Sequence, residues 1–212
     1  MSGIETVRGR EVTIHFEAKK CIHSRNCVLG RPDVFVPNVK GEWIHPDAAT
    51  PADVAHLALA CPSGAIRWSR NDGAPSESAP VVNTAHVREN GPLALHAELV
   101  VAGQPAGFRA TLCRCGASQN KPYCDGSHTA AGFTASGEPA TKDSESLAVR
   151  NGALTVTPAP NGPLRVQGPL ELVSGTGRTI LKTTETYLCR CGASANKPYC
   201  DGTHKRINFT SD

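Results

Sequence analysis

The chain contains two nearly identical stretches in which three cysteines and one histidine recur at the same spacing. The first, CRCGASQNKPYCDGSH, runs from Cys113 to His128, and the second, CRCGASANKPYCDGTH, runs from Cys189 to His204. In an extended chain, residues i and i+2 point to one face, so both thiols of a Cys-x-Cys pair can reach one inorganic centre. The last cysteine and the histidine are four residues apart, which places them on one side of a single helical turn. We therefore predict two ligand sets, namely Cys113, Cys115, Cys124 and His128, and Cys189, Cys191, Cys200 and His204.

The residues between these ligands suit a metal-binding loop. The segment GASQNKPY is rich in turn-forming residues, Asp125 is suited to cap the helical turn, and Gly126 allows a close approach of the backbone. A Cys3His set fits a structural zinc ion as well as an iron-sulfur cluster. Zinc sites usually pair their ligands as two close doublets, whereas here three ligands crowd into one loop. The spacing alone leaves both interpretations open.

A longer pattern favours iron-sulfur. The string Cys-x-Cys-x2-Ser-x3-Pro-x-Cys-Asp-Gly-Ser/Thr-His resembles the signature of the CDGSH iron-sulfur proteins, the mitoNEET family, and both copies match it at every defined position. The resemblance implies one 2Fe-2S cluster per copy, held by three thiolates and one imidazole in a small β-rich fold. It also implies that the two copies pack together as an intramolecular pseudo-dimer, because many members with one motif dimerise.

Three further cysteines, Cys21, Cys27 and Cys61, precede the repeats. They match the first, third and distant positions of a bacterial ferredoxin run, Cys-x2-Cys-x2-Cys with a remote Cys-Pro, while Ser24 stands at the middle position. One thiolate is therefore missing. The alternative is that these three cysteines have only a structural role, as small side chains buried in the core.

The sequence also places Cys61 at the end of a helix. In TPADVAHLALAC, Thr50 is a helix cap, Pro51 suits the first helical position and Asp53 stands where a capping-box acid belongs. Apolar residues from Val54 to Cys61 then recur at i, i+3, i+4 and i+7. We predict that Cys61 lies on the buried stripe of this helix and that the following proline ends it.

Residues 10–68 resemble the divergent mono-cluster ferredoxin family. The matching features are the C-x5-C spacing, P-x-x-F at 32–35, W-I-x-P-D at 43–47 and CPSGA at 61–65. The family is usually described as binding 4Fe-4S. Three thiolates are the natural complement of a 3Fe-4S cluster, which we expect here, with a 4Fe-4S cluster that uses His23 or Ser24 as its fourth ligand as the alternative.

The composition, and the glycine and proline residues that separate the short segments, predict several small domains. With 39% hydrophobic and 5% aromatic residues, the chain of 212 residues has little material for one large core. We expect an α+β protein with a ferredoxin-like domain at 1–70, a linker at 71–80, and two mostly-β CDGSH units at 81–137 and 138–212. Segments such as LALHAELVV, FRATLCRC, GALTVTP, PLRVQG and TILKTTETYLCRC predict strands, and SGTGRT predicts a hairpin turn.

The cysteine count, the hydropathy and the net charge indicate where the protein is located and which kinds of partner it can have. Nine cysteines are an odd count, and the amino-terminal residues are charged where an export signal would be apolar, so we expect a reducing, cytoplasmic location. No run approaches the roughly 18 apolar residues of a membrane span. A net charge of +3 with scattered basic residues argues against nucleic acid as a partner.

These features predict an electron-transfer protein and no enzyme, since no nucleophile with its base is evident. The alternatives are a cluster donor or a redox or pH sensor, and a zinc-stapled interaction module. Redox partner proteins are expected but unnamed, and a monomer suffices if the copies pair internally. Arg114, Arg190, Lys121 and Lys197 flank the predicted ligands and either attract an acidic redox partner or are solvated loop charges.

Overall fold

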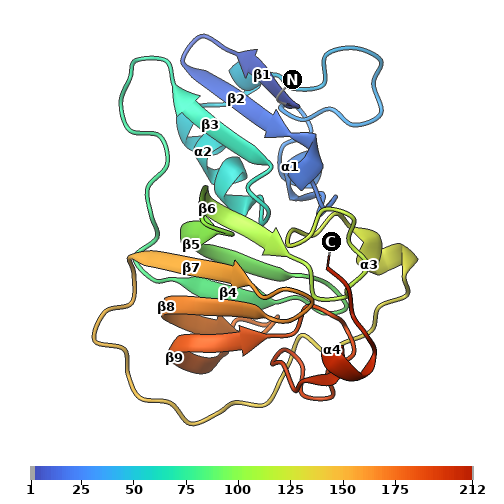
Figure 1. The fold of residues 1–212 in the computed structure, drawn as a ribbon. Helices are drawn as coiled ribbons and strands as arrows, with labels where there is room; N and C mark the ends of the chain where they lie inside the picture. The colour runs from blue at the N-terminus through green and yellow to red at the C-terminus, as the bar shows by residue number, and fades with distance from the viewer. Residues whose placement is uncertain (1–2, 212) are drawn as a thin grey trace. The chain divides into compact units, whose positions relative to one another are not determined.

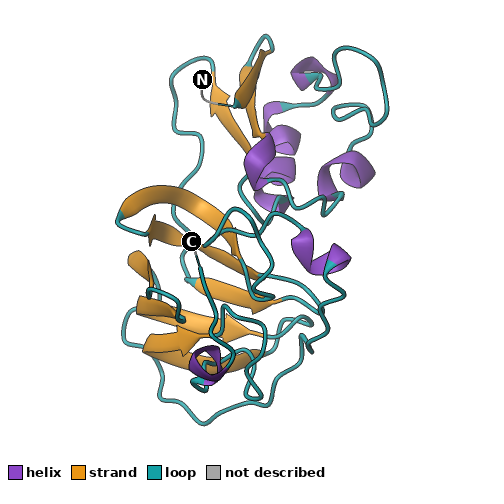
Figure 2. Ribbon diagram, turned by 45° about the vertical axis from the view of Figure 1, so that its right-hand side comes forward, coloured by secondary structure: helices purple, strands orange, loops and turns teal. Residues whose placement is uncertain are grey.

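The computed structural model describes residues 3–211, which divide into two compact units between Ser78 and Ala79. Helices and strands are mixed, and strands predominate (Figures 1 and 2). The longest helix belongs to the first unit, whereas the regular structure described for the second unit is six strands and two short helices joined by long loops. The protein is thus a mixed, mostly-β structure, as the sequence predicts at that level.

The first unit combines a small sheet with short helices. Its elements are β1 (Ile4–Arg8), β2 (Val12–Glu17), η1 (Ala18–Lys20), α1 (Asn26–Gly30), η2 (Pro46–Ala48), α2 (Pro51–Ala60) and β3 (Ile66–Arg70). The strands form an antiparallel sheet in the order β1-β2-β3, with Ile14 opposite Trp68. Alternate residues of a strand share a face, so Val12 and Ile14 both point into a core that Phe35 and Leu57 complete.

Helix α2 begins as the sequence predicts. The Thr50 hydroxyl accepts a hydrogen bond from the Asp53 N–H at 3.2 Å, and the Asp53 carboxylate accepts one from the Thr50 N–H at 3.3 Å. This reciprocal capping box satisfies two N–H groups that the first turn leaves without helical partners. The helix ends at Ala60, and Cys61 follows it with a buried side chain, 8% exposed.

The second unit contains two successive copies of one arrangement. The first copy has β4 (Thr84–Val87), β5 (Leu93–Val101), β6 (Gln104–Leu112) and α3 (Ser127–Ala130), and the second has β7 (Ala153–Pro158), β8 (Leu164–Val173), β9 (Thr179–Leu188) and α4 (Thr203–Arg206). The predicted strands are confirmed as β5 to β9, and SGTGRT forms the turn between β8 and β9. The short strand β4 was not predicted.

The short first strand of each copy pairs with both copies. Strand β4 is antiparallel to β5 of its own copy and parallel to β8 of the other. Strand β7 is antiparallel to β8 of its own copy and parallel to β5 of the other. The pairings therefore run in a closed circuit, β5-β4-β8-β7, with β6 and β9 attached outside it.

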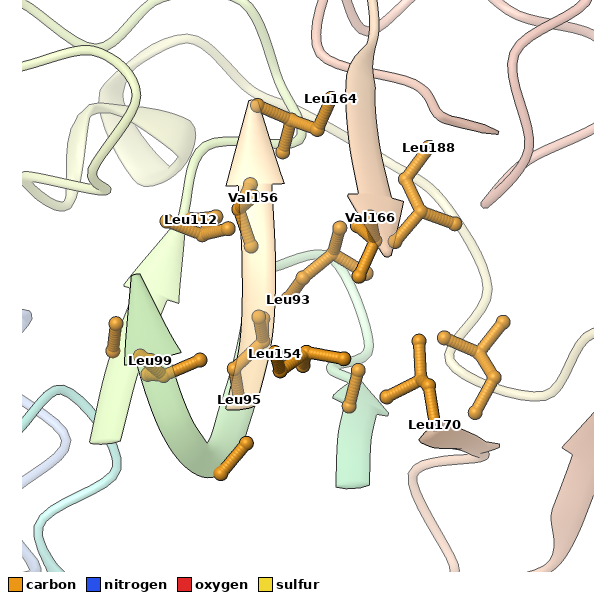
Figure 3. Close-up of a cluster of buried hydrophobic side chains, with 14 of the residues drawn as sticks. Leu93, Leu95, Leu99, Leu112, Leu154, Val156, Leu164, Val166, Leu170 and Leu188 are labelled. Atoms are coloured by element: carbon orange, nitrogen blue, oxygen red, sulfur yellow. The ribbon is translucent and has the colours of Figure 1, made fainter. Parts of the chain in front are cut away.

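The two copies share one hydrophobic core (Figure 3). Its labelled side chains are all 2% exposed or less, and they come from both copies: Leu93, Leu95, Leu99, Leu112, Leu154, Val156, Leu164, Val166, Leu170 and Leu188. Small domains bury too little surface alone. Joining the copies around one core answers that constraint.

The segment between the copies covers the free edge of β9. The Lys142 N–H donates to the Ile180 carbonyl at 2.8 Å, and the Lys182 N–H donates to the Ser144 hydroxyl at 3.1 Å. The Lys142 ammonium lies 3.5 Å from the centre of the Tyr199 ring. Residues 138–150 thereby cover backbone groups that would otherwise form an exposed sheet edge. Among residues 3–211, no helix has the length and apolar character needed to cross a bilayer.

Replacing Thr50 with alanine should lower the unfolding free energy of the first unit by about 1 kcal/mol, because the cap of α2 is lost. Thr50→Ser retains a hydroxyl and should stay close to wild type. Both tryptophans, Trp43 and Trp68, lie in this unit, so denaturant unfolding followed by tryptophan fluorescence isolates it. Equal midpoints for the alanine and serine variants would contradict the role of the cap.

Candidate metal centres

Each predicted metal loop is folded back beside the strand that precedes it. In the first copy, the Cys113 N–H donates to the Pro122 carbonyl at 2.8 Å and the Cys124 N–H donates to the Thr111 carbonyl at 2.9 Å. The second copy repeats both bonds, from Cys189 to Pro198 and from Cys200 to Tyr187. The returning chain thus brings the third cysteine next to the first two. Both loops lie with α3 and α4 at one end of the sheet (Figure 1).

The predicted ligands of each copy form two pairs. The sulfur atoms of Cys113 and Cys115 lie 3.7 Å apart, and Nδ1 of His128 lies 3.4 Å from the sulfur of Cys124. The second copy has the same two distances, 3.7 Å between Cys189 and Cys191 and 3.4 Å between Cys200 and His204. A tetrahedral centre with bonds of about 2.3 Å spaces its ligand atoms about 3.8 Å apart. Each pair therefore fits two ligand positions of one tetrahedral metal.

A serine and an aspartate hold the loop of the first copy closed. The Ser118 hydroxyl donates to the Tyr123 carbonyl at 2.6 Å, and the Asp125 carboxylate accepts from the Gln119 and Ser127 N–H groups at 2.8 and 3.0 Å. Burial alone would raise the pKa of Asp125, but these hydrogen bonds lower it to about 2. Asp125 is not the N-cap residue of the helical turn, which is Gly126, but its carboxylate accepts from the first N–H of that turn. Ser194 and Asp201 make the matching bonds in the second copy.

Glycine is required between the aspartate and the helical turn for a conformational reason. Gly126 and Gly202 have φ values of 88° and 85°, which residues with a side chain rarely adopt. This turn directs the Gly126 N–H toward the Cys124 sulfur at 3.4 Å, and that of Gly202 toward Cys200 at 3.5 Å. Donors aimed at sulfur stabilise the thiolate form that binds metal.

The arginine between the first two cysteines is buried, which corrects the expectation that it meets a partner or solvent. Arg114 is 1% exposed. Its guanidinium donates to the carbonyls of Gly91 at 2.8 Å, Ser136 at 3.1 Å and Ala135 at 3.2 Å, and also to that of Arg88. Burial lowers its pKa to about 10, so it stays charged at neutral pH.

Arg190 repeats this role and explains two other repeated fragments. Outside the metal loops, the two copies also share NGPL, at 90–93 and 161–164, and Phe-Thr, at 133–134 and 209–210. Arg190 donates to the Gly162 carbonyl at 3.0 Å and to the Ala159 carbonyl at 2.6 Å, both in or beside the second NGPL turn. Each guanidinium also lies over a phenylalanine of the repeated Phe-Thr pair, 5.4 Å from the ring centre of Phe133 and 5.7 Å from that of Phe209. The NGPL turn, the arginine and the phenylalanine are therefore one structural unit. Lys121 and Lys197 are also engaged, since each ammonium donates to a carbonyl of its own loop.

The two metal loops touch each other through glycines. A Cβ on Gly116 would lie 2.7 Å from the Cys191 carbonyl oxygen, and one on Gly192 would lie 2.3 Å from that of Cys115. No side chain fits in either gap. Burial lowers the pKa of Arg190, and the Cys113 thiolate of the other copy acts in the opposite direction. The two centres are therefore in backbone contact and within each other's electrostatic reach.

The paired thiols are poised to bind metal. A hydrogen bond from Cys115 lowers the pKa of Cys113 and raises that of Cys115, so the pair shares one proton. Burial raises the pKa of Cys124 and lowers that of His128, which keeps the imidazole neutral. Metal binding must therefore displace thiol protons, while the imidazole already has the ligand form.

In the first unit, Cys21, Cys27 and Cys61 line one cavity of about 570 Å³. Both candidate fourth ligands, His23 and Ser24, line it as well. Burial raises the pKa of Cys21 and Cys27, while the His23 and Val28 N–H groups act in the opposite direction. The structure thus brings together the three cysteines that the sequence separates.

The loop between Cys21 and Cys27 has an unusual backbone. His23 and Arg25 both have positive φ, 53° and 63°, without being glycine. Alternating left-handed residues point successive N–H groups into a concave surface, a form that many iron-sulfur and phosphate sites share. The three thiols of the cavity and the two left-handed residues beside them fit an anionic cluster.

These features define an iron-sulfur protein, and comparison with known sequences agrees. Residues 64–129 and 161–205 match the family described as iron-binding zinc finger CDGSH type, and residues 7–71 match the family described as divergent 4Fe-4S mono-cluster. Two relatives, each called uncharacterized protein YjdI, come from Escherichia coli strains K12 and O157:H7. Each is 36% identical over 67 residues, which cover 31% of this chain and 86% of the relative. The chain belongs to the CDGSH family, with a divergent mono-cluster domain before the two motifs.

Gly192→Ala should release iron from the first centre as well as the second, because the new Cβ would displace the Cys115 backbone. Gly177→Ala is the matched control, since Gly177 also has positive φ, 95°, but has nothing within 4 Å of its Cβ position. Both variants bear a backbone cost of about 1 kcal/mol. Iron and acid-labile sulfide per chain should fall only in Gly192→Ala. Equal metal content in the two variants would show that the contact between loops is dispensable.

Asp125→Asn should loosen the first loop, because a neutral amide has one acceptor oxygen where the carboxylate has two. With its pKa lowered to about 2, the carboxylate stabilises the loop fully above pH 4 and loses this effect as the pH falls toward 2. Iron release to a chelator should therefore be faster in the variant by a constant factor between pH 5 and 8. A factor that changes with pH across this range would rule out this account.

Proposed function

We propose that this iron-sulfur protein carries single electrons, through one 2Fe-2S cluster in each CDGSH copy and one 3Fe-4S cluster in the first unit. The observation that supports it most is the division of each CDGSH ligand set into two pairs. We assign no catalytic residue and propose no enzymatic activity. Its partners would be proteins that donate or accept electrons.

The ligand pairs fit a binuclear centre. Cys113 with Cys115 and Cys124 with His128 can offer two ligands to each of two metals. Iron is favoured over zinc by the CDGSH signature, which both copies carry and which the matched family describes as iron-binding.

The chain's own residues would set the properties of the bound cluster. When bound, an iron-sulfur cluster supplies a one-electron couple, and a neutral imidazole in place of a thiolate makes it easier to reduce. Nδ1 of His128 and His204 faces the paired cysteine, and both rings are only partly buried. Electrons could therefore enter and leave on the histidine side.

The first unit supports a cluster that is held by three protein ligands and not four. Its cavity is lined by three thiols, which are the complement of 3Fe-4S. Because His23 and Ser24 also line the cavity, 4Fe-4S with one of them as fourth ligand is the alternative, and it agrees with the description of the matched family. We regard this unit as ferredoxin-like on the same grounds.

The second unit supports the proposal of an intramolecular pseudo-dimer. Each copy lends its first strand to the other, and both fill one core. A monomer would then suffice. The partial exposure of His128 and His204 also favours an alternative, donation of clusters to apo proteins or loss of clusters in response to pH or oxidant.

Metal analysis of anaerobically purified protein tests the proposal. We expect roughly seven irons and eight sulfides per chain, and eight of each if the first unit holds 4Fe-4S. An electron paramagnetic resonance signal in the oxidised protein would identify 3Fe-4S. A colourless protein that contains zinc would refute the proposal, and rapid transfer of clusters to an apo ferredoxin would favour the donor alternative.

A further inference from the structure

The two CDGSH copies differ most in charge directly after the histidine ligand. The first copy continues with Thr129, Ala130 and Ala131, and the second continues with residues 205–207, Lys-Arg-Ile. All six residues are exposed, and Ile207 is 48% exposed. The same backbone therefore presents a neutral surface beside one centre and a basic, partly apolar surface beside the other. We call residues 205–207 the second rim.

Beside the second rim, the third cysteine of the ligand set and the aspartate that follows it are more exposed than their counterparts in the first copy. Cys124 is buried, 2% exposed, whereas its counterpart Cys200 is partly exposed. Asp125 is partly buried, whereas Asp201 is exposed. Exposure and charge thus distinguish the same centre, although the two ligand sets have equal distances.

Among residues 3–211, the charges of the second rim have no ion-pair partner. Among the described residues, neither Lys205 nor Arg206 forms an ion pair, and Arg206 donates only to the Thr203 hydroxyl at 2.7 Å. Both copies carry a lysine and an aspartate in the loop, so these cancel in the comparison. The second rim therefore adds, next to His204, two positive charges that form no ion pair with any described residue.

We propose that the second rim is the docking surface for the acidic face of a protein redox partner, and that electrons are exchanged through the second centre. This inference rests on the electron-carrier function proposed above. Complementary charge speeds encounter between proteins, and an exposed apolar residue beside an arginine is typical of the contact that follows. Two cations are too few for the footprint of a nucleic acid.

The binding test uses poly-L-glutamate as an acidic probe with cluster-loaded full-length protein. Lys205→Thr with Arg206→Ala, which copies the first centre, should weaken binding about tenfold at low salt. The matched control, Arg8→Thr with Lys40→Ala, removes the same charge from exposed positions of the first unit and should bind like wild type. Equal binding by both variants, or stronger binding of a DNA duplex than of poly-L-glutamate, would overturn the proposal.

A kinetic test adds the reverse substitution. Two cobalt(III) complexes serve as oxidants, the anionic EDTA complex and the cationic hexaammine complex. In either case the reduced protein gives one electron to cobalt(III), which becomes cobalt(II). The Lys205→Thr, Arg206→Ala variant should react more slowly with the anion and faster with the cation, and about 1 M salt should abolish both differences. Thr129→Lys with Ala130→Arg adds the same two charges beside the first centre and should raise the rate at which the protein reduces the anionic complex. Unchanged rates in both variants would refute docking at the second rim, whereas wild-type protein that reduces neither oxidant but still binds poly-L-glutamate would refute the electron-carrier function alone.

Discussion

The burial of one guanidinium in each CDGSH copy is the constraint on which the metal loops depend. Arg114 and Arg190 are held by backbone carbonyls of the NGPL turns and lie over Phe133 and Phe209. An unpaired buried carbonyl or charge costs free energy, so these contacts fix the arginine and with it the cysteines on either side. The spacing of the thiols is thus set by residues that are far away in sequence and touch no metal.

This arrangement also accounts for the duplication. The first strand of each copy completes the sheet of the other, and the leucines of both fill one core. Gly116 and Gly192 allow the two metal loops to meet at backbone distance. Each loop is held mainly by bonds within its own copy, whereas the core and the contact between the loops are shared, so neither copy could keep its core covered without the other.

Local features were predictable from sequence and long-range ones were not. The capping box at Thr50, the strands β5 to β9 and the pairing of thiol and imidazole across one helical turn depend on residues close in the chain. The parallel pairing of β4 and the cover over β9 depend on contacts between distant segments, which no short pattern records. Arg114 was misjudged because sequence shows a charge but not its burial. The choice among His23, Ser24 and no fourth ligand depends on cluster chemistry and stays a prediction.

The segment at 138–150 has a consequence beyond covering a sheet edge. When two identical chains form a symmetric pair, every mutation appears twice, and the two centres must remain equivalent. Here a peptide connection joins the copies, so each can change alone. The chain can therefore keep one centre enclosed and adapt the other to its surroundings. A homodimer of identical chains cannot specialise in this way.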